Sequence, residues 1–469
     1  MSQKKYKNII IENVLIEDYA AEGKSIAKIN DLVYFIDNAV PGDVADIRIQ
    51  RKKRNFAEAT AVKFHKFSEF RTEAFCKHFG TCGGCKWQNL ELSKQLYFKQ
   101  KQVVDNIERI GKVKDFEVLT IALSPESKFY RNKLEYTFTN RRWFTNEEMH
   151  TENRNENGLG FHMPGMFDRV LDIQNCYLQP EPSNSIRLAI RDFAFENNYT
   201  FYSPREHTGL LRNLIIRTTS VGETMVLFSF SENNVEMIEM MLNYVSEKFP
   251  EITSLLYAIN PQVNDSLYNY TEIITYKGNS HIIEKLGDLK FRIGPKSFFQ
   301  TNTNQAFEMY KAVLEFAGLS GSEIVYDLYT GTGTIANFIA SNAKKVVGIE
   351  YVDEAVKDAE INSELNSITN CTFLSGDMKD ILTEDIFNIH GNPDVIITDP
   401  PRAGMHKDVI DVILKSNAKK IVYVSCNPAT QARDIELLGV RYKLIKIQPI
   451  DMFPHTHHVE NIAFLEIFD

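Results

Sequence analysis

Three of the six cysteines stand close together in the segment Cys76-x5-Cys82-Gly-Gly-Cys85, and Cys176 follows farther along the chain. Cysteines at such tight spacing, with two glycines between them, indicate a metal site. Four thiolates hold either zinc or an iron–sulfur cluster. Zinc ribbons usually carry two CxxC pairs, and the absence of a second pair from this sequence favours an iron–sulfur cluster. A disulfide framework is not expected, because such bonds need an oxidising compartment.

A further cysteine, Cys426, stands in VSCNPAT directly after the apolar stretch KIVYVS. Pro428 is suited to the first position of a helix. A thiol at the start of a helix gains thiolate character, and the thiolate is the nucleophilic form. The sequence therefore predicts a reactive Cys426, whereas Cys371 is interpreted as a small buried apolar residue.

The segment PIDMFPHTHHVEN near the end of the chain contains Glu460, which we interpret as a candidate general base. The same segment contains His455, His457 and His458. Their spacing lacks a matching fourth ligand, so a zinc site is not expected there.

Residues 327–340, DLYTGTGTIANFIA, combine the end of a strand with a turn that carries Gly331 and Gly333. Glycines at the start of a helix let the backbone approach a ligand closely. The GxGxxG pattern is not met, because Ala336 takes the last glycine position, so no pyrophosphate is implied. Glu350 ends the next apolar strand, where a carboxylate can accept both ribose hydroxyls. Together these residues predict a site for a nucleoside cofactor.

Two more acids follow apolar strands. Asp399 opens DPPRAG directly after DVIIT, and its two prolines predict a rigid loop over the sheet. Asp377 follows CTFLSG in the equivalent place one strand earlier, where it could reach an adenine amino group.

These residues all fall where strands and helices alternate. From about residue 300, the apolar stretches IVYDLY, KVVGIE, CTFLSG, DVIITD, KIVYVSC, YKLIKIQPI and NIAFLEIF have helical segments between most of them. This alternation predicts a doubly wound, mainly parallel sheet. Ligands bind beyond the carboxyl ends of the strands in such sheets, which is where the candidate residues fall.

The first part of the chain has a different pattern of apolar and polar residues. Residues 1–68 alternate apolar and polar positions between turns, which predicts a small β-barrel. Residues 69–293 read as a mixed α+β central domain that contains the cysteines, and residues 294–469 as the α/β domain. The polar stretch 145–158 is expected to be an exposed loop.

Composition and charge limit the function. Hydrophobic residues make up 43% of the 469 residues and charged residues 25%, which is ordinary for a globular protein. No apolar run suits a membrane span and no secretory signal is recognisable, so a cytoplasmic protein is expected. The net charge is -9, yet residues 1–145 carry 26 Lys and Arg against 18 Asp and Glu. This basic front third could contact phosphates of a nucleic acid.

Taken together, these motifs resemble those of the bacterial RNA 5-methyluridine methyltransferases, in particular the iron–sulfur branch that acts on 23S rRNA. The resemblance extends to YRNKLEYTF (130–138), GLLRNLIIR (209–217) and GPKSFFQTN (294–302). It implies an N-terminal TRAM domain with an OB-like barrel that binds RNA, and a C-terminal Rossmann-like class I methyltransferase domain. One departure is Thr330, where many relatives carry cysteine; little consequence is expected, because the backbone acts at this turn.

The same resemblance assigns roles to residues. It implies that Cys76, Cys82, Cys85 and Cys176 hold a [4Fe–4S] cluster. It implies that Gln300, Tyr329, Glu350, Asp399 and Asp377 bind S-adenosyl-L-methionine, and that Cys426 is the nucleophile and Glu460 the base. The implied reaction is methylation of carbon 5 of a uridine, through a covalent bond between Cys426 and uracil.

The implied protein is a monomer with 23S rRNA as its partner, since relatives that methylate tRNA lack the cysteine set. Three alternatives remain open at this point. They are a tRNA uracil-5-methyltransferase, a nucleic-acid methyltransferase that modifies amino groups, and an RNA-binding protein without catalysis.

Overall fold

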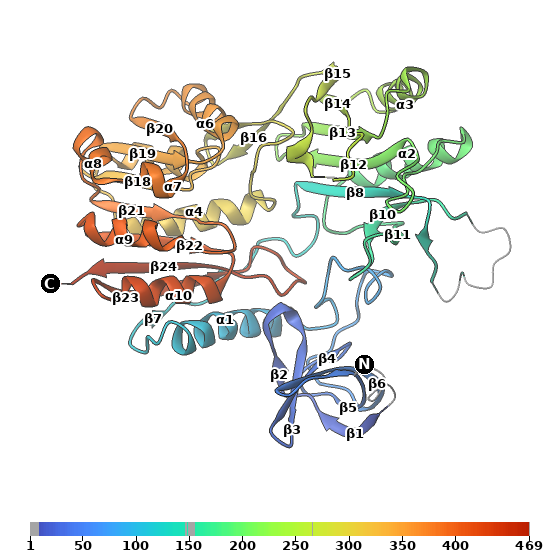
Figure 1. Ribbon diagram of the computed structural model, residues 1–469, viewed down its shortest axis with the longest axis horizontal. Coiled ribbons are helices and arrows are strands. Elements are labelled where there is room, and N and C mark those ends of the chain that lie inside the picture. The colour runs from blue at the N-terminus through green and yellow to red at the C-terminus, as the bar shows by residue number, and fades with distance from the viewer. Residues whose placement is uncertain (1–8, 146–147, 149–154, 265, 469) are drawn as a thin grey trace.

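The computed structural model describes residues 9–145, 148, 155–264 and 266–468 (Figure 1). Most of the stretch 145–158, predicted to be an exposed loop, lies outside these residues. Three large β-sheets and one hairpin organise the described chain.

The N-terminal sheet has six strands in the order β1-β5-β6-β4-β3-β2. Its strands are β1 (Ile10–Leu15), β2 (Asp18–Tyr19), β3 (Ser25–Ile29), β4 (Leu32–Asp37), β5 (Val44–Lys52) and β6 (Phe56–Lys66). Ile47 and Ile49 of β5 are buried while Arg48 between them is exposed, as strand alternation requires. Residues 51–54, the basic stretch between β5 and β6, are exposed.

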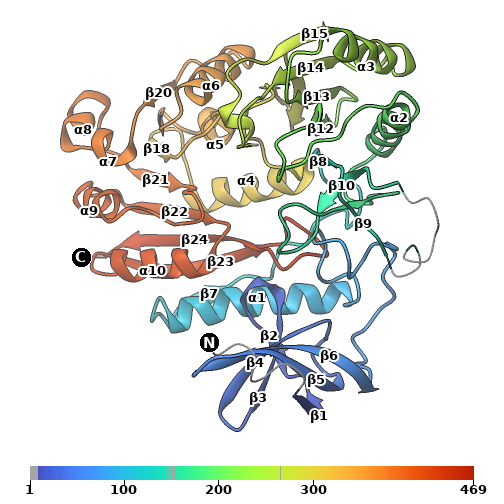
Figure 2. The ribbon, with the colours of Figure 1, turned by 45° about the vertical axis from the view of Figure 1, so that its right-hand side comes forward.

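The central sheet has eight strands in the order β15-β14-β13-β12-β8-β10-β11-β9. They are β8 (Lys133–Thr139), β9 (Arg142–Trp143), β10 (Gly158–His162), β11 (Val170–Asp172), β12 (Leu211–Thr218), β13 (Thr224–Phe230), β14 (Ser254–Ile259) and β15 (Ile274–Gly278). Helices α2 (Ser183–Glu196) and α3 (Val235–Lys248) pack together beside it (Figure 2). The hairpin of β16 (Ile282–Leu286) and β17 (Leu289–Ile293) follows.

The C-terminal sheet has the order β20-β19-β18-β21-β22-β24-β23-β7. Its main strands are β18 (Ile324–Leu328), β19 (Lys345–Glu350), β20 (Cys371–Ser375), β21 (Val395–Thr398), β22 (Lys420–Ser425), β23 (Tyr442–Ile450) and β24 (Glu460–Ile467). The strands from β18 to β22 pair in parallel, whereas β24 runs antiparallel to both of its neighbours. The predicted doubly wound, mainly parallel architecture is confirmed.

Helices cover both faces of this sheet, so its strands are apolar on both sides. Val395 and Ile397 of β21 pack on one face and Ile396 packs on the other. The first face is covered by α4 (Thr303–Ala317), α5 (Thr334–Ile339) and α6 (Asp353–Leu365). The second face is covered by α1 (Leu92–Arg109), α7 (Met378–Ile381), α8 (Glu384–His390), α9 (Lys407–Lys415) and α10 (Pro428–Leu438).

Two elements from the segment predicted to be central lie with the C-terminal sheet. Helix α1 packs against α10, between the N-terminal and C-terminal sheets (Figures 1 and 2). The short strand β7 (Glu117–Val118) pairs in parallel with β23. The division of the chain at residues 69 and 294 stays a prediction. Among the described residues, no helix is long and apolar enough to cross a membrane.

Candidate active site

The carboxyl ends of the parallel strands meet at one edge of the C-terminal sheet. Tyr329 follows β18, Glu350 ends β19, Asp399 follows β21 and Cys426 follows β22. Glu460 begins the antiparallel strand β24, so it starts where β22 ends. The register pairs Ser425 with Asn461, which are the direct neighbours of Cys426 and Glu460. The sheet therefore brings the candidate nucleophile and the candidate base to the same edge.

The glycine turn between β18 and α5 is built around a buried carboxylate. Asp327 Oδ2 accepts hydrogen bonds from Thr330 Oγ1 at 2.5 Å and from the backbone N of Ala336 at 3.1 Å. Burial raises the pKa of Asp327 to about 7. Gly333 has a φ of 74°, and a Cβ on it would lie 2.8 Å from the Cβ of Ala359. Only glycine combines this left-handed backbone with such close packing.

Gly331, the other glycine of the turn, faces open space. Its φ is 56°, and no atom lies within 4 Å of the position that a Cβ would take. Its backbone N donates to Glu350 Oε2 at 3.0 Å. Glu350 Oε1 accepts from the backbone N of Tyr351 and of Val352, at 2.9 and 3.0 Å. Three backbone donors therefore fix this carboxylate beside the turn, which fits a site that accepts ribose hydroxyls.

Asp377 follows β20 at this edge, and Gln300 lies in the segment between β17 and α4. Gln300 precedes α4, and its backbone carbonyl accepts from Asn132 Nδ2 at 2.9 Å. Asp377 is the N-cap of α7 and its Oδ2 lies 3.2 Å from Lys379 Nζ. The Lys379 side chain lowers the pKa of Asp377. Asp377 is therefore ionised and already partnered.

Buried acids surround Cys426. Burial and the nearby Asp399 raise the pKa of Glu460 to about 8. Burial and Asp327 raise the pKa of Asp399 to about 7. Burial, Glu460 and Asp399 raise the pKa of Cys426 to about 11.

The expectation that a helix start would favour the Cys426 thiolate is therefore wrong for this structure. Helix α10 does begin at Pro428, but its N-cap is Asn427, whose side chain accepts from the backbone N of Ala429 at 3.2 Å. Cys426 precedes this N-cap and is not part of the first turn of the helix. Burial and two neighbouring carboxyl groups decide its pKa instead.

Arg402 is a residue of this site that the sequence did not single out. Its guanidinium opposes the rise in pKa of both Cys426 and Glu460. Its backbone carbonyl accepts from Asn427 Nδ2 at 2.9 Å and from Thr430 Oγ1 at 3.2 Å. These bonds tie the DPPRAG loop to the start of α10. The signal available in that motif was an arginine three residues after the strand-end Asp399.

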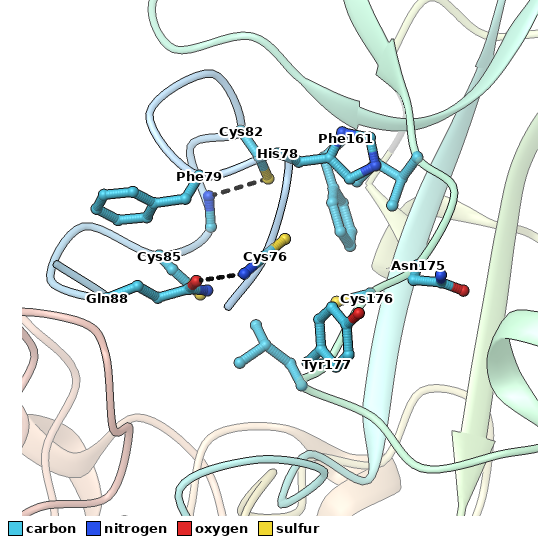
Figure 3. A pocket seen from close by; sticks show the side chains of 13 residues that line it. Cys76, His78, Phe79, Cys82, Cys85, Gln88, Phe161, Asn175, Cys176 and Tyr177 are labelled. Carbon is cyan, nitrogen blue, oxygen red and sulfur yellow. Dashed lines mark hydrogen bonds between the residues drawn. The ribbon is translucent and has the colours of Figure 1, made fainter. Parts of the chain in front are cut away.

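The four cysteines of the predicted metal site line one pocket, with Phe79 and Phe161 beside them (Figure 3). We call this the cysteine pocket. Cys76, Cys82 and Cys85 come from the loop before α1, and Cys176 comes from the segment before α2. The backbone N of Cys76 donates to Gln88 Oε1 at 3.2 Å, and the backbone N of Gly84 donates to Cys82 Sγ at 3.4 Å (Figure 3).

Burial raises the pKa of Cys82 to about 11 and that of Cys85 to about 12. Within the described ranges, no three His, Cys, Asp or Glu side chains are arranged to hold a metal ion. The assignment of these cysteines to a cluster stays a prediction. Burial also lowers the pKa of His455, His457 and His458, to about 4, 3 and 4.

Comparison with known proteins agrees with this geometry. The family model described as tRNA (Uracil-5-)-methyltransferase matches residues 281–467, and the TRAM domain model matches residues 11–62. An uncharacterized RNA methyltransferase from Bacteroides thetaiotaomicron is 56% identical over 453 residues, which are 96% of this chain and 100% of the relative. The chain belongs to the RNA (uracil-5-)-methyltransferase family. It is a TRAM-containing methyltransferase that uses S-adenosyl-L-methionine.

Two further comparisons cover this methyltransferase over nearly its full length. An uncharacterized RNA methyltransferase from Chlorobaculum tepidum is 36% identical, over 98% of this chain and 97% of the relative. The crystal structure of the Pyrococcus abyssi tRNA (uracil-54, C5)-methyltransferase with S-adenosyl-L-homocysteine superposes with a TM-score of 0.74 at 27% identity. It covers 97% of the methyltransferase and 100% of that chain.

Proposed function

We propose that this methyltransferase, as a cytoplasmic monomer, methylates carbon 5 of a uridine in 23S rRNA with Cys426 as nucleophile and Glu460 as base. The observation that carries the proposal is the register of β22 and β24. It sets Cys426 and Glu460 at adjoining strand ends, next to the acids of the cofactor edge. An enzyme that methylates amino groups would need neither a thiol nor a base at this place.

The chemistry follows from uracil. Carbon 5 is too weak a nucleophile to take a methyl group directly. Attack of the Cys426 sulfur on carbon 6 forms a carbon–sulfur bond and places the electron pair of the double bond on carbon 5, as an enolate. Carbon 5 then attacks the methyl group of the sulfonium donor. The methyl–sulfur bond breaks, and the sulfur keeps its electron pair and leaves as a neutral thioether. Glu460 removes the proton from carbon 5, the double bond reforms and the carbon–sulfur bond breaks.

Protonation states define what each residue contributes. With a pKa of about 11, Cys426 is a thiol at neutral pH, so its proton must pass to solvent as the sulfur attacks carbon 6. The Arg402 guanidinium favours the thiolate. With a pKa of about 8, Glu460 is mostly protonated at neutral pH, and its ionised fraction is the form that accepts the carbon 5 proton. A base with a pKa near the working pH is suited to proton transfer.

We assign the donor site to Gln300, Tyr329, Glu350, Asp399 and Asp377. The carboxylate of Glu350, fixed by three backbone donors, is suited to the ribose hydroxyls. Tyr329 has a φ of 63°, so the turn that directs its side chain is left-handed at this residue. The Asp399 carboxyl, with a pKa of about 7, is partly ionised at neutral pH, and we assign its ionised form to the sulfonium.

We further propose that Cys76, Cys82, Cys85 and Cys176 hold a [4Fe–4S] cluster. Their convergence on one pocket supports this assignment. Their thiolates would be the ligands that hold the iron atoms of the cluster. Anaerobically purified protein should be brown and contain iron and sulfide, whereas tightly bound zinc without iron would contradict the cluster.

A tRNA is the second candidate substrate, because the Pyrococcus abyssi enzyme of similar structure is a tRNA (uracil-54, C5)-methyltransferase. Mapping 5-methyluridine in 23S rRNA and in tRNA, from cells with and without this gene, distinguishes the two. Loss of the modification from 23S rRNA supports the first substrate, and loss from tRNA supports the second.

The covalent step has a separate test. Cys426→Ala should bind RNA and donor yet transfer no methyl group. RNA that contains 5-fluorouridine should trap the wild-type enzyme as a covalent adduct on a denaturing gel, since fluorine cannot leave as a proton does. Continued methylation by Cys426→Ala would refute the mechanism and favour the enzyme that methylates amino groups.

A further inference from the structure

The loop of residues 451–459, which joins β23 to β24 and leads directly into Glu460, is held from several parts of the chain. Four consecutive backbone carbonyls accept hydrogen bonds of 3.0 Å from side chains or from the loop of the cysteine pocket. The donors are Asn302 Nδ2 to Met452, Lys99 Nζ to Phe453, Tyr130 Oη to Pro454, and the backbone N of Lys86 and Trp87 to His455. Such a set of bonds leaves the loop little freedom.

Helix α1 supplies two of the buried side chains that hold this loop. Gln95 and Lys99 are four residues apart and therefore share one face of the helix. Gln95 Oε1 accepts from the backbone N of His455 at 2.8 Å. Lys99 is fully buried and donates to Asp451 Oδ1 at 2.5 Å. The ion pair fixes the first residue of the loop to a helix that begins far away in the sequence.

The ion pair lies beside the candidate base. In the β23–β24 ladder Ile450 is the register partner of Glu460, and Asp451 directly follows Ile450. Opposite residues of an antiparallel pair have Cα atoms about 4.5–5.5 Å apart. A displacement of Asp451 would therefore move its neighbour Ile450, and Ile450 is paired directly with Glu460.

Packing alone does not account for a lysine at this position. Replacing a buried ion pair by apolar side chains of similar volume is often neutral or stabilising. We propose that Lys99 is a positioning residue, which holds Asp451 and through it keeps Glu460 placed to remove the proton from carbon 5. This proposal rests on the proposed covalent mechanism, in which Glu460 acts after Cys426 has already formed its bond.

The order of these two steps provides the test. Lys99→Met should leave formation of the Cys426–RNA adduct nearly unchanged and slow its release by about tenfold to a hundredfold, the scale of a misplacement of about 1 Å. Quenched single-turnover reactions on unmodified RNA, resolved on a denaturing gel, measure both rates. A purely structural defect would instead lower both rates together.

Lys101→Met is the matched control. Lys101 is two residues farther along α1 and is also ion-paired, but its partners are Asp18 and Asp105, at 2.6 and 2.9 Å. This variant loses a lysine from the same helix without touching loop 451–459. It should form and release the adduct at wild-type rates.

A double variant tests whether an unpaired acid, rather than lost positioning, explains the defect. Lys99→Met/Asp451→Leu removes both charges and should fold, as a cooperative thermal transition would verify. Slow release should persist in it. Normal release in the double variant, or in Lys99→Met itself, would overturn the positioning role. If the wild-type enzyme forms no adduct even with 5-fluorouridine RNA, the covalent mechanism fails and this proposal fails with it.

Discussion

Glu460 should destabilise the folded protein at neutral pH, and Glu460→Gln should relieve this effect. Burial and Asp399 raise its pKa from an ordinary value of 4.5 to about 8. Between these two values the folded state keeps a proton that the unfolded chain has lost, so stability falls as the pH rises. One pKa unit corresponds to about 1.4 kcal/mol. The proton that the folded state keeps therefore lowers the free energy of unfolding by about 3 kcal/mol at pH 7. Glutamine does not titrate and carries no such penalty.

Urea unfolding followed by circular dichroism, at several pH values from about 5 to about 8, measures this difference. Glu460→Gln should be only slightly more stable than the wild type near pH 5, and its advantage should widen up to pH 8. Equal stability of the two proteins at every pH would refute the argument. It would mean that Glu460 is solvated or paired in the folded state.

The same variant should fail in catalysis at one defined step. Without a base the carbon 5 proton cannot leave efficiently, so Glu460→Gln should accumulate a methylated covalent adduct. In the wild type, about one tenth of Glu460 is ionised at pH 7 when its pKa is about 8. The release rate should therefore rise with pH and level off above 8. A stabilised variant with normal release would remove Glu460 from the mechanism.

Four further substitutions follow from the site. Glu350→Ala and Asp399→Ala should each weaken S-adenosyl-L-methionine binding by about 1.5–3 kcal/mol in calorimetry, the value of a charged hydrogen bond, and unchanged affinity would exclude them. Arg402→Ala should raise the pKa of Cys426 further and slow adduct formation, with partial rescue by lysine; an unchanged pH–rate profile would contradict this. Gly333→Ala should lower both the midpoint temperature of thermal unfolding and the affinity for the methyl donor, because its φ is 74° and its Cβ would lie 2.8 Å from that of Ala359. If neither quantity changes, the turn relaxes to accept the Cβ.

The strand-end residues were predictable because two local patterns agree at each of them. An apolar run marks a strand of a parallel sheet, and the polar residue that follows must lie at its carboxyl edge. Glu350, Asp399 and Cys426 were located in this way before any geometry was known. The order of strands brings them to one edge, and that order follows from how alternating strands and helices pack.

Properties set by distant parts of the chain were not predictable from local patterns. The pKa of Cys426 depends on Glu460 and on burial, neither of which the neighbouring residues encode, so the helix argument gave the wrong direction. Arg402 acquires its role from the same tertiary contacts. The placement of α1 beside α10 was missed because its amphipathic pattern shows that one face is buried and not what covers it.

The Lys99–Asp451 bond also affects how the chain is made, because its partners are 352 residues apart. At a synthesis rate of about 5–20 residues per second, Asp451 is added about 18–70 s after Lys99. Until residues 428–450 are made, late in that interval, α1 has neither α10 nor β23 to pack against, and Val103 and Ile107, which are fully buried in the finished protein, remain exposed. The N-terminal sheet can fold before strands β23 and β24 have been synthesised. The active site is therefore completed only after the start of β24, which carries Glu460, has been made.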